Sequence, residues 1–157
     1  MSVFVIADTH FGHANIIKYC NRPFKDTEEM DKFIVQEWNK VIKSDDTVFH
    51  LGDVGIGSQD YLKSIVSQLN GHKHLICGNH DTYSDEFYRD CGFETVSRFP
   101  IIWNNFFIFS HEPLQLTETT PYGNLYGHVH NDVKYTDTEN TKCVCVEKLN
   151  YTPYKIF

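Results

Sequence analysis

Arginine is scarce in this chain: Arg22, Arg89 and Arg98 are the three among 157 residues, and basic residues form no run. The formal net charge is −7. Proteins that hold nucleic acid without sequence preference need several Lys or Arg contacts to phosphates. We therefore expect no strong non-specific binding to nucleic acid. A small phosphate ester could still bind, because metal ions would add positive charge that the formal count omits.

Long apolar runs are also missing. No segment approaches the ~20 apolar residues of a membrane-spanning helix, and the run that follows Met1 is too short for a signal sequence. The cysteines form an odd set without the spacing of a disulfide framework (Cys20, Cys77, Cys91, Cys143 and Cys145). We expect no membrane association and a location in the reducing cytoplasm. Cys143 and Cys145 alternate on one predicted strand face, which favours buried small hydrophobes over a redox pair.

The composition is that of a folded domain. Hydrophobic residues make up 41% of the chain and aromatic residues 15%, which is ample for a packed core. A single domain over residues 1–157 is expected, and it would bury roughly 70% of its unfolded surface.

Strands and helices alternate through the first half of the chain, and strands predominate in the second half. Helices are predicted at Gly12–Cys20, Thr27–Ile42 and Ser84–Cys91. A further helix is predicted to begin after the capping residue Ser58 and to end at Asn70-Gly71. Strands are predicted at 2–7, Thr47–Leu51, Lys73–Cys77, Thr95–Phe99, Ile101–Trp103, Phe106–Ser110, Asn124–Gly127 and Lys142–Glu147. The pattern favours an α/β fold with two packed β-sheets, mainly mixed, and flanking helices.

Blocks of Asp, Asn and His residues follow the ends of several predicted strands. They are Asp8-Thr9-His10, Gly52-Asp53, Gly78-Asn79-His80-Asp81, His111 and Gly127-His128-Val129-His130. Because strand ends meet along one edge of a sheet, side chains far apart in sequence can converge there. Oxygen and imidazole ligands without a thiolate predict a site for two divalent cations.

The spacing within the blocks suggests individual roles. Asp53 is alone in its block and could bridge two ions, with one oxygen to each. Asn79 offers a neutral oxygen ligand. His128 and His130, two residues apart on an extended segment, would project to the same side and could each bind a different ion. The neighbouring glycines would let the chain turn sharply beside the ions.

In this order the blocks resemble the signature of the calcineurin-like metallophosphoesterases, which runs D-x-H, G-D, G-N-H-[DE], H and G-H-x-H. The resemblance extends over nearly the whole chain, and the segment from His10 to Ile16 is similar to the H-F-G-H-x-N-I opening of small bacterial and phage-type members. Asp81 stands where Glu is common, and Glu112-Pro113 follows His111 where glycine is frequent. No insertion is large enough to form a cap, so an open site is expected.

The resemblance implies a ligand set for each of two divalent ions. Mn²⁺ is expected first, with Fe²⁺, Zn²⁺ and Ni²⁺ as alternatives. One ion would be held by Asp8, His10, Asp53 and His130, and the other by Asp53, Asn79, His111 and His128. His80 would be the catalytic residue that faces the substrate phosphate, and Asp81 would orient it.

The implied reaction is hydrolysis of a phosphoric ester by in-line attack of a metal-bridging hydroxide. We favour a phosphodiester substrate, such as a nucleotide or cyclic nucleotide. A phosphomonoesterase, a non-catalytic metal-binding scaffold and a nuclease are the alternatives, and the acidic balance weakens the last. His13, Asn15 and Arg22 are candidate substrate contacts, although an ordinary salt bridge or a surface position is an equal alternative for Arg22. His50, His72 and His74 match no ligand position and are expected to be structural.

Overall fold

The computed structural model describes residues 1–157, and apolar strands build its first β-sheet, in the order β4-β3-β2-β1-β9. The strands are Val3–Ile6 (β1), Thr47–His50 (β2), His72–Ile76 (β3), Phe93–Ser97 (β4) and Tyr154–Lys155 (β9). Strands β1 to β4 run parallel, and β9 pairs with β1 in the antiparallel direction. All the carboxyl ends of the parallel strands therefore lie at one edge.

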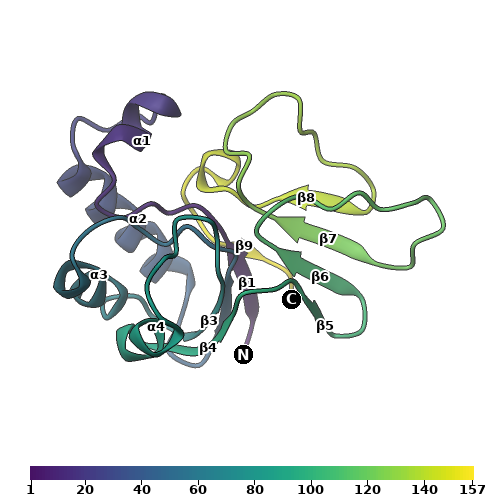
Figure 1. Cartoon of the computed structure of the whole chain (residues 1–157), viewed down its shortest axis with the longest axis horizontal. Coiled ribbons are helices and arrows are strands. Elements are labelled where there is room, and N and C mark those ends of the chain that lie inside the picture. Colours follow the sequence, from purple (N-terminus) through teal and green to yellow (C-terminus); the bar gives the residue numbers. More distant parts are fainter.

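The second sheet has the order β5-β6-β7-β8. Its strands are Ile101–Trp103 (β5), Phe107–Ser110 (β6), Gly123–Tyr126 (β7) and Thr141–Cys143 (β8). Strands β6 to β8 are parallel, whereas β5 pairs with β6 as a hairpin. Asn104 and Asn105 lie in the three-residue connection of this hairpin with φ angles of 53° and 55°, a left-handed conformation that Asn adopts more readily than most residues. Figure 1 shows the two sheets side by side, with the second sheet opposite the helices.

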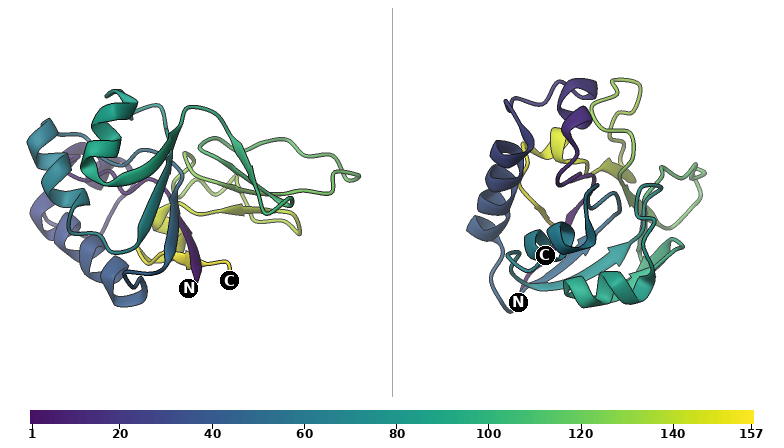
Figure 2. Two further views of the ribbon diagram at one scale, coloured as in Figure 1. Left: turned by 90° about the horizontal axis from the view of Figure 1, so that it is seen from below. Right: turned by 60° about the vertical axis from the view of Figure 1, so that its left-hand side comes forward.

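The helices all lie on the outer side of the first sheet (Figures 1 and 2). They are Ala14–Tyr19 (α1), Thr27–Val41 (α2), Gln59–Val66 (α3) and Asp85–Cys91 (α4), and a 3₁₀ helix follows at Val146–Leu149. Asp26 caps α2, and Ser58 and Ser84 cap α3 and α4, each by accepting a hydrogen bond from a backbone N–H of the first turn. None of the helices is long and apolar enough to cross a membrane.

Alternation along the strands of the first sheet creates two cores. On β1, Phe4 and Ile6 pack among the helices in a cluster to which every α-helix contributes. Val5 and Ala7 face the other way, into a cluster shared with Phe109 and other residues of the second sheet. This is the period of two that a strand buried on both faces must show. The α/β class with two mixed sheets and flanking helices is confirmed.

Three differences from the predicted elements have a clear physical reason. β4 begins at Phe93, two residues earlier than predicted, because it continues directly from Gly92, where α4 ends with φ 113°. β8 ends at Cys143 instead of Glu147, because the chain turns into the 3₁₀ helix. Strand β9 has no counterpart among the predictions, since two exposed residues carry no periodic signal.

Candidate metal centre

The predicted ligands come from the loops that follow β1, β2, β3, β6 and β7. The two sheets are joined next to these loops, where Ala7 forms a parallel bridge with Cys145 and Ala7 N donates to Val144 O at 2.8 Å. Gly127 N donates to His111 O at 2.8 Å, which brings the loops after β6 and β7 together. The carboxyl ends of parallel strands from both sheets thus meet at one place, as the order of the motifs predicted.

A first group of side chains gathers around Asp8. His10 Nε2 and His130 Nε2 each lie 3.7 Å from Asp8 Oδ1, and Asp53 Oδ2 lies 3.4 Å from His10 Nε2. The ligand atoms of Asp8, His10 and His130 all lie within 4.8 Å of one another. Asp8, His10 and Asp53 are buried, so the group forms the floor of the site.

The atoms of this first group fit a divalent ion. Asp8 Oδ1 and His10 Nε2 are buried and have no hydrogen-bond partner, although buried polar atoms are normally paired. Two ligands that share one ion at about 2.1 Å each stand roughly 3.0–3.6 Å apart. The spacing between the two atoms is close to that range and too long for a hydrogen bond. Carboxylate and imidazole donors also suit the divalent transition metals.

A second group forms around Asp53, Asn79, His111 and His128. His111 Nε2 lies 3.5 Å from Asp53 Oδ2, 3.0 Å from Asn79 Oδ1 and 3.1 Å from His128 Nδ1. His111 Nδ1 lies 2.8 Å from Leu51 O. When Nδ1–H donates to this carbonyl oxygen, the lone pair of Nε2 is left for a metal. Asn79 and His128 are exposed, so this group opens to solvent.

Asp53 connects the two groups through a single atom. Its Oδ2 faces both His10 Nε2 and His111 Nε2, whereas its Oδ1 accepts a hydrogen bond from the His80 backbone N–H at 2.9 Å. The expectation that each carboxylate oxygen would serve one ion stays a prediction, because an oxygen that accepts one backbone hydrogen bond still has a lone pair. A bridge through Oδ2 is the arrangement that the geometry supports.

Asp81 holds the Asp53 loop and the Asn79 loop together. Its Oδ2 accepts from Asp53 N and Gly78 N, both at 2.7 Å, and its Oδ1 accepts from Val54 N at 3.0 Å. The side chain is buried. Asp81 is therefore a structural anchor for two ligand loops, and the role predicted for it, orienting His80, stays a prediction.

Five of the predicted ligands adopt left-handed backbone conformations, which non-glycine residues rarely use. Their φ angles are 61° at Asp8, 51° at His10, 57° at Asp53, 71° at His128 and 51° at His130. The prediction that His128 and His130 lie on an extended segment is therefore wrong. Their rings separate because of the turned backbone: His128 joins the second group and His130 the first. Such strain is typical of functional sites held by surrounding structure.

Two glycines allow the loops to approach one another. At Gly52, where φ is 93°, a Cβ would lie 2.6 Å from His111 Nδ1 and closer still to Gly78 N. At Gly127, a Cβ would lie 2.5 Å from Asp8 Oδ2. Side chains at these positions would displace the ligands, so the glycines serve close packing as well as turning.

Without metal, the carboxylates keep protons on the nearby imidazoles. Burial alone would lower the pKa of His130, but contacts with Cys20 and Glu147 and the charge of Asp8 raise it to about 10. Burial would also lower the pKa of His10, but the nearby carboxylates of Asp53 and Asp8 raise it above its usual range. Burial would raise the pKa of Asp8, yet His10, His111 and His130 hold it below its usual range. Metal binding at the first group must therefore displace protons.

His80 lies beside the first group without belonging to either. Its side chain is exposed, and its ring centroid is 5.4 Å from that of His10 and 6.1 Å from that of His13. The ring nitrogens His13 Nδ1 and His10 Nδ1 are 3.1 Å apart. The structure thus places His80 and His13 together next to His10, while Asn15 is exposed on α1.

Arg22 is not available to a substrate. Its side chain is 0% exposed, and its Nη2 lies 2.7 Å from Glu147 Oε1. It also donates to the backbone oxygens of Asp8 and Thr9. The structure therefore favours the salt-bridge alternative for Arg22 over a substrate contact.

The remaining histidines have structural environments. His50 is buried and its Nε2 lies 2.9 Å from Thr9 Oγ1, and Thr9 Oγ1 donates to Val54 O at 2.7 Å. His72 pairs with Glu94 on the surface, and His74 contacts Thr95. Two further residues lie near the ligands, Glu147 and Cys145, and motif spacing alone does not identify them. The Sγ atom of Cys145 lies 3.2 Å from Asp8 Oδ2.

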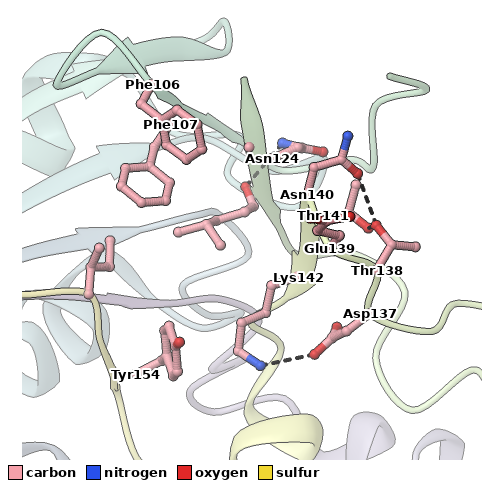
Figure 3. A pocket seen from close by; sticks show the side chains of 13 residues that line it. Phe106, Phe107, Asn124, Asp137, Thr138, Glu139, Asn140, Thr141, Lys142 and Tyr154 are labelled. Carbon is pink, nitrogen blue, oxygen red and sulfur yellow. Dashed lines mark hydrogen bonds and ion pairs between the residues drawn. The ribbon is translucent and has the colours of Figure 1, made fainter. Parts of the chain in front are cut away.

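A separate pocket of about 320 Å³ lies at the other end of the second sheet (Figure 3). Phe107, Gly123 and Thr141, which begin β6, β7 and β8, line it, whereas the predicted ligands follow the carboxyl ends of β6 and β7. Lys142 Nζ lies 2.9 Å from Asp137 Oδ2 at this pocket and 4.8 Å from the centroid of the Tyr154 ring. None of its lining residues is a predicted ligand.

Two proteins of known sequence are similar to this chain, one over nearly its whole length and one over about half of it. An uncharacterised protein of Methanocaldococcus jannaschii, MJ1445, is 33% identical over 164 residues, which cover 98% of this chain and 86% of the relative. The gene 66 protein of Mycobacterium phage L5 is 38% identical over 78 residues, which cover 48% of this chain and 37% of the phage protein.

Solved structures share the fold. A protein of unknown function from Aquifex aeolicus, AQ665, superposes with a TM-score of 0.74 at 27% identity, over 98% of this chain and 95% of its own. The nuclease MPE of Pseudomonas putida superposes with a TM-score of 0.54 at 19% identity, over 82% of this chain and 61% of its own. The model of the family named calcineurin-like phosphoesterase matches residues 1–154. Two groups of candidate metal ligands that meet at Asp53 accompany this match, and the chain belongs to the calcineurin-like phosphoesterase family.

Proposed function

We propose that this protein is a phosphodiesterase that depends on two divalent metal ions, with Mn²⁺ as the first candidate. The observation that carries the proposal is the position of Asp53 Oδ2, which lies 3.4 Å from His10 Nε2 and 3.5 Å from His111 Nε2. One oxygen between two ligand groups suits a dinuclear centre. When bound, such a metal pair supplies Lewis acidity that activates a water and offsets charge on the phosphoryl oxygens.

The side chains around the centre divide the remaining work. His80 is exposed beside the first group and is able to donate a hydrogen bond to a phosphoryl oxygen or a proton to the leaving alkoxide. His13 lies next to it and is the proposed substrate contact, together with Asn15. Asp81 fixes the backbone of the Asp53 and Asn79 loops, so the groups that meet the substrate are already in position before it binds.

The cationic residues favour a diester over a monoester. A phosphomonoester carries about −1.5 to −2 charge at pH 7, whereas a diester carries a single charge. Both arginines that contact a motif loop are engaged with carboxylates: Arg22 with Glu147, and Arg98 with Asp85. A small diester, such as a cyclic nucleotide, therefore suits the site better. All five cysteines are free, which supports the cytoplasm as the proposed location.

The test compares two model substrates, bis-p-nitrophenyl phosphate and p-nitrophenyl phosphate, after chelation and again after Mn²⁺ is restored. We expect chelation to abolish turnover and Mn²⁺ to restore it, mainly on the diester. A preference for the monoester would replace the proposal with a phosphatase. Two bound ions without turnover of either ester would favour the scaffold. Tight binding to DNA or RNA that weakens steeply with salt would favour a nuclease.

A further inference from the structure

Glu147 lies outside every motif, yet its carboxylate is buried at the metal centre. It belongs to the 3₁₀ helix at Val146–Leu149, and its side chain is 5% exposed. Glu147 Oε1 accepts a hydrogen bond from Arg22 Nε at 2.9 Å. The same oxygen lies 3.1 Å from His130 Nδ1, on the opposite side of the ring from the Nε2 that faces Asp8.

Arg22 extends this contact to a second predicted ligand. Its Nη2 donates to Asp8 O at 2.7 Å, and its Nη1 donates to Thr9 O at 2.9 Å. The guanidinium thus holds the backbone on which Asp8 sits, while it also holds the carboxylate that orients His130. One buried ion pair therefore braces two of the four side chains around the first ion position.

We propose that Glu147 and Arg22 are positioning residues that set the affinity of the first ion position, formed by Asp8, His10, Asp53 and His130, and leave the second unaffected. The inference rests on the proposed function only in that these groups bind metal. A carboxylate that accepts the Nδ1–H of His130 fixes the ring and makes its Nε2 a better donor to a metal. Loss of such a partner typically weakens metal binding by about 10–100-fold.

The second position has a different support. His111 is oriented by the backbone oxygen of Leu51, at 2.8 Å from Nδ1, and no charged side chain takes that role. Because Glu147 and Arg22 contact none of Asn79, His111 and His128 in the structure, a change at the ion pair should reach only the first position. This asymmetry separates a positioning role from a general effect on folding.

An ion held directly by Glu147 is the competing interpretation. Cys20, His130 and Glu147 lie close enough for one ligand atom from each to share an ion. Arg22 argues against it, because its Nε and Nη2 already lie 2.9 and 2.7 Å from the same oxygen of Glu147. A cation at that place would stand beside a buried guanidinium, and two like charges in a low-dielectric setting repel strongly.

The experiment measures Mn²⁺ binding by isothermal titration calorimetry in two single-position backgrounds. His128→Ala removes a ligand of the second position only, and His10→Ala removes a ligand of the first. We expect Glu147→Gln to weaken binding by about 10–100-fold in the His128→Ala background and to leave it within about twofold in the His10→Ala background. Equal weakening in both backgrounds, or none in either, would overturn the proposal.

Glu94→Gln is the matched control, because Glu94 also pairs with a histidine, His72, but on the surface. Glu94→Gln should leave the Mn²⁺ affinity of both ion positions unchanged. In the otherwise unaltered chain, Glu147→Gln should weaken one of two Mn²⁺ binding steps and spare the other, so two equally weakened steps would also contradict the proposal.

Glu147→Gln leaves Arg22 buried without its partner, so circular dichroism must show that the variant folds. If it does not, Glu147→Asp keeps the charge but shortens the reach to His130, and a folded Glu147→Asp protein with the native affinity at both positions would refute the proposal. No ester is used in these titrations. A protein that shows the expected asymmetry but hydrolyses no diester would refute the proposed function alone.

Discussion

His10 Nε2 and Asp8 Oδ1 face each other at 3.7 Å in the protein interior, and neither atom has a hydrogen-bond partner. Unpaired buried polar atoms cost about 1–3 kcal/mol each. A divalent ion between them would satisfy both atoms at once. The same ion would meet Asp53 Oδ2, which in turn reaches the second group through His111.

Asp53→Asn should impair both ion positions, because the bridging atom Oδ2 serves each of them and the substitution removes its charge. The folded protein should therefore bind fewer than two Mn²⁺ ions and lose turnover. Metal content by mass spectrometry after gel filtration, together with thermal unfolding, measures this. In the native protein, each of the two ions should stabilise the fold by about 2.7 kcal/mol when Mn²⁺ is at 100 times its dissociation constant, and the variant should lose most of that gain. Two tightly bound ions in the variant would contradict the bridging role.

His80→Ala should retain two metal ions but lose about 10²–10⁴-fold in kcat, as expected for a positioned proton donor. The reason is geometric: the His80 ring is exposed and belongs to neither ligand group, while its backbone N–H, which holds Asp53 Oδ1, is unchanged by the substitution. Metal content and steady-state rates are to be measured on the same preparation. His74→Ala is the control, since His74 contacts only strand residues away from the centre. Undiminished turnover in His80→Ala would exclude the catalytic role.

His50 should make the metal-free protein less stable in acid. Burial lowers its pKa to about 3, so between pH 6.5 and 3 the unfolded chain takes up a proton that the native protein refuses. Stability must fall as the pH falls through that window, by about 1.4 kcal/mol per pH unit from this residue. His50→Gln retains a donor to Thr9 and does not titrate. Between pH 6.5 and 5, the stability advantage of the native protein over this variant should shrink by about 2 kcal/mol.

Urea unfolding at several pH values provides that comparison. Parallel pH profiles for the native protein and His50→Gln would show that the buried ring does not resist protonation.

Asp31 should have the opposite pH dependence. Burial raises its pKa to about 6, against the hydrogen bonds from Tyr61 and Gly12. As the pH rises, the native protein keeps this proton after the unfolded chain has lost it. The stability that the proton contributes is therefore fully present below pH 3.8 and is lost as the pH rises through 6. Asp31→Asn imitates the protonated form. Its stability relative to the native protein should rise by about 2–3 kcal/mol between pH 4 and 7.

The same unfolding measurement tests this, with Asp90→Asn on the exposed face of α4 as the control. A stability difference that stays constant across this pH range would mean that Asp31 loses its proton at the same pH in the native protein as in the unfolded chain.

The sequence by itself determined most of the fold and the members of the site. Short segments of four to five residues with buried apolar side chains mark β1, β2, β3 and β6, and polar ligands follow them. Both signals are local, because strand formation and the turn that follows depend on neighbouring residues. The order of the motifs then sufficed to name the family, which the family model confirmed. The cap residues Asp26 and Ser58 were predictable for the same reason.

Only the tertiary structure decided how the ligands divide and what supports them. Left-handed backbone at His128 and His130 separates two side chains that an extended strand would have placed together. Glu147 reaches Arg22 across 125 positions of sequence, and β9 exists because it pairs with β1. No local pattern encodes these contacts. They arise when the two sheets pack and bring buried charges close enough that each must find a partner, which is a property of the assembled core.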